Sequence, residues 1–422
     1  MYKDSRRGFL KASLAMGVGA AAGVSHAQTL QRDPSFKGVT DKSKLPKGRL
    51  MVLAYMHARH WREYTGSTVA SSLLSVAYPG RALAVTASSS TNLHDIAAPL
   101  NNPDGVLFGV GHDVREVLEI FNPDLSLRTT LRFDGIRFKG HAFPYGKGIL
   151  IAAESSAAPD KNGFLLYLDS KGTVLSKHTT GGLGPHEIVE CGEYLAVAHY
   201  GSAPRKGQYT VGHMYDLVSP GVSFLKKDNL QFVAFHELPD EGGAITHLAH
   251  QGNGQVVAMG MNALKPVVDG PISIAVMREA IKYQVDLLAE ETGPNAFFHQ
   301  PIPLHYVDVE KGITGKTDAI PRLMRRGQSF AQDWSLGLTV ATFAASQTLL
   351  VQDARTKKIR FINTLDYGVA DPRGCAMIPG TACVAVSGNA NNIAIINLIN
   401  DSLVDLIGIP LEQHSHMRWL SA

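Results

Sequence analysis

A repeated unit of four short strands constrains the fold of this chain more than any other feature. The unit is clearest in residues 139–180, where apolar runs at 141–143, 148–154, 163–169 and 173–179 are separated by segments containing glycine, proline, asparagine or aspartate. Apolar runs punctuated in this way are typical of antiparallel strands joined by turns. Units of about 40–50 residues with four such strands, of WD40-like length, are characteristic of β-propeller blades.

The unit recurs, and the first strand of each copy can be counted. The anchors of these first strands are His94, His141, His186, His247, about Trp334, about Cys375 and about His416. The long interval after His247 contains an insertion, about 271–291, whose apolar residues have helical spacing. Seven anchors predict an all-β, seven-bladed β-propeller over residues 49–422 with one inserted helix.

The end of the chain indicates how the ring closes. The last unit, around His416, has room only for an innermost strand, whereas apolar runs near Leu50 and Ala84 precede the first complete unit. Strands from the two ends therefore complete one blade and leave no open edge. A β-sandwich is the alternative, but it explains neither the regular period nor the truncated last unit.

The first residues are predicted to be an export signal. Arg6 and Arg7 belong to a stretch that matches the twin-arginine pattern S-R-R-x-F-L-K, and the apolar run 14–24 precedes a small-x-small cleavage site ending at Ala27. The run is shorter than the roughly 20 residues of a membrane-spanning helix, which argues against an anchor. We expect a signal peptide over 1–27, a mature N-terminal segment over 28–48 and a periplasmic protein without a membrane span.

Charge excludes one class of partner. The leader contains four of the 40 basic residues and one of the 37 acidic ones, so the remaining chain has 36 of each. Balanced charge does not favour nucleic acid. A periplasmic protein or a small molecule is the expected partner.

Histidines at equivalent repeat positions are the candidate site. His94, His141, His186 and His247 fall at the start of the inner strands of four consecutive blades, and symmetry carries them to one height around the central channel. Histidine is the commonest protein ligand for transition metals at neutral pH. The pattern predicts a metal site, its cofactor a divalent transition metal. Buried histidines that hydrogen-bond to neighbouring blades are the alternative.

Other polar residues near the predicted rim have weaker patterns. Asp95 and Glu187 directly follow two of the histidines, and alternation along a strand argues against their being ligands together with them. We interpret them as exposed rim carboxylates; orienting an imidazole on the next blade is the alternative. Asp333 and His416 are further rim candidates. The pair His57 and His60 is interpreted as loop packing.

Two of the three cysteines flank a predicted hairpin. Cys375 and Cys383 surround a Pro-Gly turn signal, which would place them nearly opposite each other on paired strands. Buried free thiols are the favoured interpretation, because a core of this size needs no covalent link, and a disulfide is the alternative.

Several short motifs resemble one known family. "KGHAF", "GPHEI", "AHYG", "ITHLA" and "PRGCA" occur in this order behind a twin-arginine leader. Together they resemble the exported bacterial propeller family catalogued as domain of unknown function 1513. The likeness runs from about His94 to the end, with departures at Ala142, at Thr246, at the "AHYG" stretch and in the order of Gly374 and Cys375. That family has no established activity, but its members often occur beside genes linked to iron acquisition, which implies a periplasmic role near metal uptake.

Function is the least determined part of the prediction. No nucleophile elbow, zinc-protease, P-loop or haem-attachment motif is present in the sequence. We expect a binding or accessory protein that uses a metal. The alternatives are a metal-dependent propeller enzyme, such as a lactonase-like hydrolase or an oxidoreductase, and a scaffold that docks partners through the inserted helix near Ile281.

Overall fold

The fold is known from a computed structural model of the whole chain. The residues that it describes are 35–421, apart from 56–70, 79, 81, 89–92, 101, 112–115, 159–160, 202–218, 240, 242, 262–300, 355–357, 390–391 and 410–413. The predicted signal peptide, the predicted inserted helix and the pair His57 and His60 lie outside the described residues.

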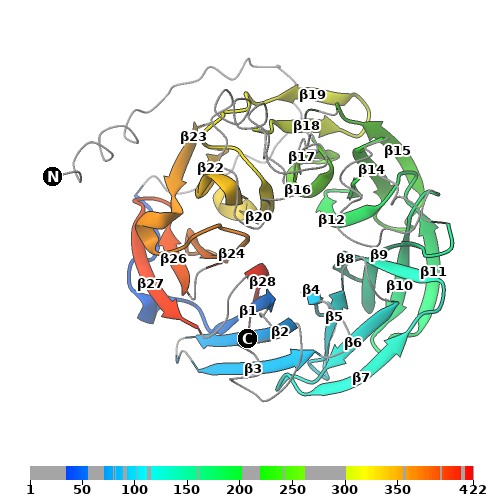
Figure 1. Cartoon of the computed structure of the whole chain (residues 1–422), viewed down its shortest axis with the longest axis horizontal. Coiled ribbons are helices and arrows are strands. Elements are labelled where there is room, and N and C mark those ends of the chain that lie inside the picture. The colour runs from blue at the N-terminus through cyan, green and yellow to red at the C-terminus, as the bar shows by residue number, and fades with distance from the viewer. Residues whose placement is uncertain are drawn as a thin grey trace, which may run out of the picture.

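The described strands form seven four-stranded antiparallel sheets in a ring (Figure 1), so the predicted seven-bladed propeller is confirmed. From the inner to the outer strand, the blades are β4(Leu93–Ala97)-β5(Leu107–Gly111)-β6(Val117–Phe121)-β7(Leu127–Arg132), β8(Ile136–Tyr145)-β9(Gly148–Ser155)-β10(Phe164–Asp169)-β11(Val174–Thr179), β12(Pro185–Cys191)-β13(Tyr194–His199)-β14(Gly221–Lys226)-β15(Phe232–Glu237), β16(Ile245–Gly252)-β17(Gln255–Gly260)-β18(Leu304–Asp308)-β19(Gly312–Lys316), β20(Gly327–Asp333)-β21(Leu338–Phe343)-β22(Thr348–Asp353)-β23(Lys358–Asn363), β24(Gly374–Ile378)-β25(Cys383–Ser387)-β26(Asn392–Asn397)-β27(Ser402–Gly408) and β28(His414–Ser421)-β1(Gly48–Tyr55)-β2(Ser71–Tyr78)-β3(Leu83–Ser88).

The last blade combines both ends of the chain. Its inner strand β28 pairs antiparallel with β1, from Gly48 opposite Ser421 to Ala54 opposite His414. The N-terminal segment before β1 is also attached, because the Val39 amide donates to the Thr381 carbonyl of blade six. Ring closure by strands from both termini is therefore confirmed, with β2 as a strand that the apolar runs alone did not reveal.

The hydrophobic core is divided among the interfaces between blades. Strand β1 shows how: Leu50 and Val52 pack against blade six, whereas Met51 and Leu53 pack against blade one. Both faces of an inner or middle strand are thus buried, which explains why these strands read as almost continuous apolar runs. At about 1.5–3 kcal/mol for each fully buried large apolar side chain, these interfaces hold the ring together.

Three 3-10 turns follow strands β20, β21 and β23 of the fifth blade. They are η5(Trp334–Leu336), η6(Ala344–Ser346) and η7(Thr364–Tyr367), and a fourth, η1(Lys42–Lys44), precedes β1. In the part of the chain that the structure describes, no helix has both the length and the apolar character needed to cross a membrane.

One predicted strand anchor was misplaced, and the favoured interpretation of two cysteines holds. The anchor at about Trp334 was misplaced, because the inner strand β20 ends at Asp333 and Trp334 begins η5, where it stacks on His250 at 4.2 Å between ring centroids. Cys375 and Cys383 are buried free thiols, as favoured, and no disulfide joins them. The register pairs Cys383 with Ile378, so Cys375 faces blade five and Cys383 faces blade seven.

Candidate metal centre

Local backbone irregularities aim the histidines at the axis. The inner strand β4 pairs Leu93 with Gly111 and Asp95 with Val110, which leaves His94 as an extra, unpaired residue. Equivalent register shifts occur near the start of β8, β12, β16, β20 and β28. Such β-bulges redirect a side chain and interrupt the ladder, and they are common beside functional sites. The alternation expected of a regular strand therefore fails at these positions.

Glycines make two of these irregularities possible. Gly140, directly before His141, has φ +105°, and Gly184, before Pro185 and His186, has φ +57°. Residues with a Cβ rarely adopt either conformation. Glycine is therefore needed most at 140, because seven described residues of other types have φ values of 47–69°, the range of Gly184, and none approaches +105°.

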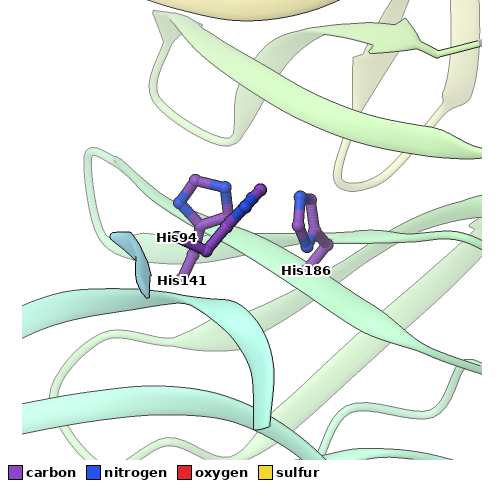
Figure 2. A group of neighbouring side chains, drawn as sticks. All are labelled: His94, His141 and His186. Atoms are coloured by element: carbon purple, nitrogen blue, oxygen red, sulfur yellow. The ribbon is translucent and has the colours of Figure 1, made fainter. Parts of the chain in front are cut away.

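Five imidazoles gather in one cluster, which we call the histidine cluster: His94, His141, His186, His247 and His416. Figure 2 shows three of them, with the ring of His141 close to those of His94 and His186. One nitrogen from each of these three lies within 4.8 Å of the others, and the same holds for His141, His247 and His416. The structure thus brings together the four histidines named from the sequence and adds His416, which had been placed at the rim.

Carboxylates of the preceding blade hold two of the rings. The Nδ1 atom of His141 lies 3.1 Å from Oδ2 of Asp95 on β4. That of His247 lies 3.4 Å from Oε2 of Glu187 on β12, whose carboxylate also accepts the Leu248 amide at 2.7 Å. An imidazole whose Nδ1–H faces a carboxylate presents its Nε2 lone pair in the other direction.

Uncharged acceptors orient two more rings. The Nδ1 atom of His186 lies against the carbonyl oxygen of Lys139 on the preceding blade. The Nδ1 atom of His416 lies 2.9 Å from Oγ of Ser329, while its Nε2 lies 2.9 Å from Nε2 of His94. Four of the five rings therefore have Nδ1 engaged at the outside of the cluster.

One ring nitrogen of the histidine cluster is buried without a hydrogen-bond partner. Nε2 of His141 is buried without a hydrogen bond, in a side chain that is 4% exposed. A buried polar atom left unpaired costs roughly 1–3 kcal/mol, so such atoms usually have a function. Burial lowers the pKa of His141 despite the neighbouring Asp95, and burial also lowers the pKa of His416. Both rings are therefore neutral at pH 7, the form that binds metals.

Arg418 fixes the carboxylate behind His141. Its Nε donates to Oδ1 of Asp95 at 2.7 Å and its second nitrogen to Oδ2 at 2.5 Å, and it also donates to the Ala142 carbonyl at 3.0 Å. Burial alone would raise the pKa of Asp95, but Arg418 and His141 hold it well below its ordinary value. Likewise, burial opposes ionisation of Glu187, but His247, His141 and the Leu248 amide together outweigh it, so the pKa is lowered. Both carboxylates are ionised at neutral pH.

The rim interpretation of these residues was wrong. Asp95 is 1% exposed, and both it and Glu187 orient an imidazole on the next blade, the less favoured alternative. Asp333 contributes nothing to the cluster: its carboxylate caps η5 through the Leu336 amide and accepts the Gly380 amide. The bulges explain the error for Asp95 and Glu187, since they displace each carboxylate from the position that strict alternation would give it.

Tyr200 and Lys139 contact the histidine cluster at His186. The hydroxyl of Tyr200 lies 3.1 Å from Nδ1 of His186, and the ammonium of Lys139 lies 5.3 Å from the centre of the Tyr200 ring. Lys139 is buried beside Glu154, at 3.6 Å, which also pairs with Arg137 at 3.1 Å. Nothing in the repeat pattern distinguished these residues, because Lys139 lies on β8 of the second blade only and Tyr200 follows β13 of the third only.

Comparisons with known proteins add little to this geometry. No family model matches the chain, and no curated protein matches it. Among solved structures, it is similar to one described as KlHsv2 with loop 6CD replaced by a Gly-Ser linker, at 10% identity and a TM-score of 0.43, over 75% of this chain and 81% of that chain. Similarity at this level identifies neither a family nor a function.

Proposed function

We propose that this protein is an exported propeller that binds one divalent transition metal ion in the histidine cluster and serves as a binding or accessory protein in metal handling. The twin-arginine motif supports export to the periplasm. The resemblance to the exported propeller family supports a role near iron or metal acquisition. The histidine cluster supplies the imidazole nitrogens that would bind the ion.

The orientation of the rings carries this proposal. In His141 and His247, Nδ1 faces a carboxylate of the preceding blade, and this leaves Nε2 for an ion. Metal-binding histidines almost always use their second nitrogen in this way. Nδ1 of His186 faces a carbonyl and Nδ1 of His416 a hydroxyl, so an ion would compete for their Nε2 atoms with the Tyr200 hydroxyl and with His94. Nε2 of His141 is buried without a partner, and its ring contacts the other four, so an ion in the cluster would satisfy it.

Elemental analysis of protein isolated from the periplasm without a histidine tag tests the proposal. We expect about one equivalent of a transition metal in the wild type and a loss of most of it in His141→Ala, because that ring contacts the four others. His178→Ala is the matched control, since this residue lies on outer strand β11 and bonds Ser176.

Two results would contradict the proposal. One is wild-type protein that remains free of metal after incubation with Zn²⁺, Cu²⁺ or Fe²⁺ and gel filtration. The other is unchanged metal content in a correctly folded His141→Ala variant, judged by circular dichroism.

A further inference from the structure

We infer that the five imidazoles form a tetragonal coordination set, with His141 as the axial ligand, and that the position opposite His141 takes a small anion. This inference rests on the proposed function and specifies the geometry and ligand class of the same site. It predicts an ion that prefers right-angled ligands, and it disfavours a closed tetrahedral zinc site.

The contacts among the rings have the pattern of a square with one ring on its axis. His141 contacts each of the other four, with ring centroids 4.4–5.4 Å away. The other four form a closed cycle, in which the centroid distances are 5.1 Å for His94–His186, 5.4 Å for His186–His247, 5.1 Å for His247–His416 and 4.3 Å for His416–His94. The rings thus have the connectivity of a square pyramid. Their nitrogens form two groups of three that share His141, and these groups would have to converge when an ion binds.

One pair of nitrogens already has the separation of neighbouring ligands in such a set. Nε2 of His94 and Nε2 of His416 share a hydrogen bond at 2.9 Å, which an ion would replace. Two nitrogens at about 2.0–2.1 Å from an ion are about 2.9 Å apart when they subtend 90°, and about 3.3–3.4 Å apart at the tetrahedral angle. The pair therefore fits a right angle. Tetragonal nitrogen sites favour Cu(II) or Ni(II), and Cu(II) binds imidazole more strongly.

Charge identifies the class of the sixth ligand. Asp95 and Arg418 form an ion pair, so their charges cancel, and Glu187 leaves one negative charge beside the cluster. A divalent ion would leave this site with one positive charge, to which the buried group of Lys139, Arg137 and Glu154 adds another. A small anion from solution would offset this charge in a place where water screens poorly. His94 and His416 are partly exposed, so small solutes can reach the cluster from solution.

Spectroscopy of the full mature chain, freed of metal and reloaded with one equivalent of CuSO₄ or CoCl₂, tests this inference. We expect a tetragonal Cu(II) EPR signal with nitrogen superhyperfine structure, weak visible Co(II) bands typical of five or six ligands, and a new charge-transfer band when azide is added. Intense Co(II) bands of a tetrahedral site, two ions per chain, or a spectrum indifferent to azide would each overturn it. These failures are distinguishable from failure of the proposed function, in which no ion binds at all.

Two variants separate the roles of the rings. His141→Ala binds the ion weakly and is therefore loaded with excess CuSO₄. The Cu(II) that binds should retain the equatorial nitrogen signal but take up azide with at least a tenfold change in apparent affinity, because a second axial position becomes available. His94→Ala should remove one equatorial nitrogen and change the superhyperfine pattern. Identical spectra for the two variants would contradict the assignment of His141 to the axis. His178→Ala, which should match the wild type, controls for the substitution itself.

Discussion

At the scale of single residues, the site depends on carboxylates that lie one blade before the imidazoles they orient. Asp95 illustrates this, since it holds Nδ1 of His141 while Arg418 holds both of its oxygens. The arginine keeps the carboxylate ionised and fixed in a place where burial would favour the neutral form. Asp95 is therefore a positioning residue, whose effect on the proposed metal binding would pass through His141.

Replacing Asp95 by asparagine tests that role. Asp95→Asn keeps the shape of the side chain but removes the charge that raises the basicity of His141. We expect metal affinity to fall about 10–100-fold, the usual effect of losing an outer partner of a ligand. Chelator competition measures the affinity, and Cu(II) EPR reports whether the axial field has changed.

The control for this variant lies far from the cluster. Asp124→Asn alters an exposed turn in which the carboxylate accepts from Ser126, and we expect it to bind metal as the wild type does. If Asp95→Asn has native affinity and an unaltered EPR spectrum, the carboxylate only supports the fold.

At the scale of strands, the bulges decide which side chains reach the axis. The register shift in β8 leaves three residues, 139–141, opposite one residue of β9, and Gly140 occupies its middle with φ +105°. A bulge interrupts the hydrogen bonds of the ladder and gives a side chain a new direction. The same device recurs at the start of other inner strands, so the cluster is built by a repeated backbone feature.

Gly140→Ala should therefore disturb both the fold and the site. A Cβ at this φ costs on the order of 1–2 kcal/mol, which would be relieved by a change in the bulge and hence in the direction of His141. We expect a lower denaturation midpoint and weaker metal binding in the same chelator assay.

Gly135→Ala separates the two effects. Gly135 also has a positive φ, +79°, and an added Cβ would meet open space there. This variant should lose similar stability but keep its metal affinity. Equal affinities for the two variants would refute the role given to the bulge in β8.

The elements were more predictable than the directions of the side chains. The blade at 136–179 has the four strands expected from its turns, because period and turn chemistry are local properties of the sequence. Asp95 and Glu187 were misinterpreted because a bulge depends on pairing with the next strand. His416 was recognised as a blade anchor, but its membership in the cluster depends on how β28 closes the ring, and no local pattern encodes this.

At the scale of the whole molecule, the proposed twin-arginine signal would link export to folding. That route carries folded proteins, so the propeller and its ion would be assembled before transport. Changing Arg6 and Arg7 together to lysine should abolish export while leaving the fold intact, because the signal precedes the described propeller. Cell fractionation and immunoblotting measure the outcome.

A leader-swapped protein provides the control for this experiment. The same propeller behind another twin-arginine leader should reach the periplasm, which would show that the lysine variant fails at the signal. Accumulation of the double-lysine protein in the periplasm, processed to normal size, would refute the assignment of the leader.

The pairing of β28 with β1 also sets the time at which the site can exist. His416 and Arg418 lie on β28, the last strand of the propeller to be made, whereas its partner strand β1 is among the first. Until β28 has been made, the seventh blade lacks its inner strand, and the cluster lacks one imidazole and the arginine that holds Asp95. A growing chain that lacks β28 therefore cannot assemble the complete site that we propose for the ion.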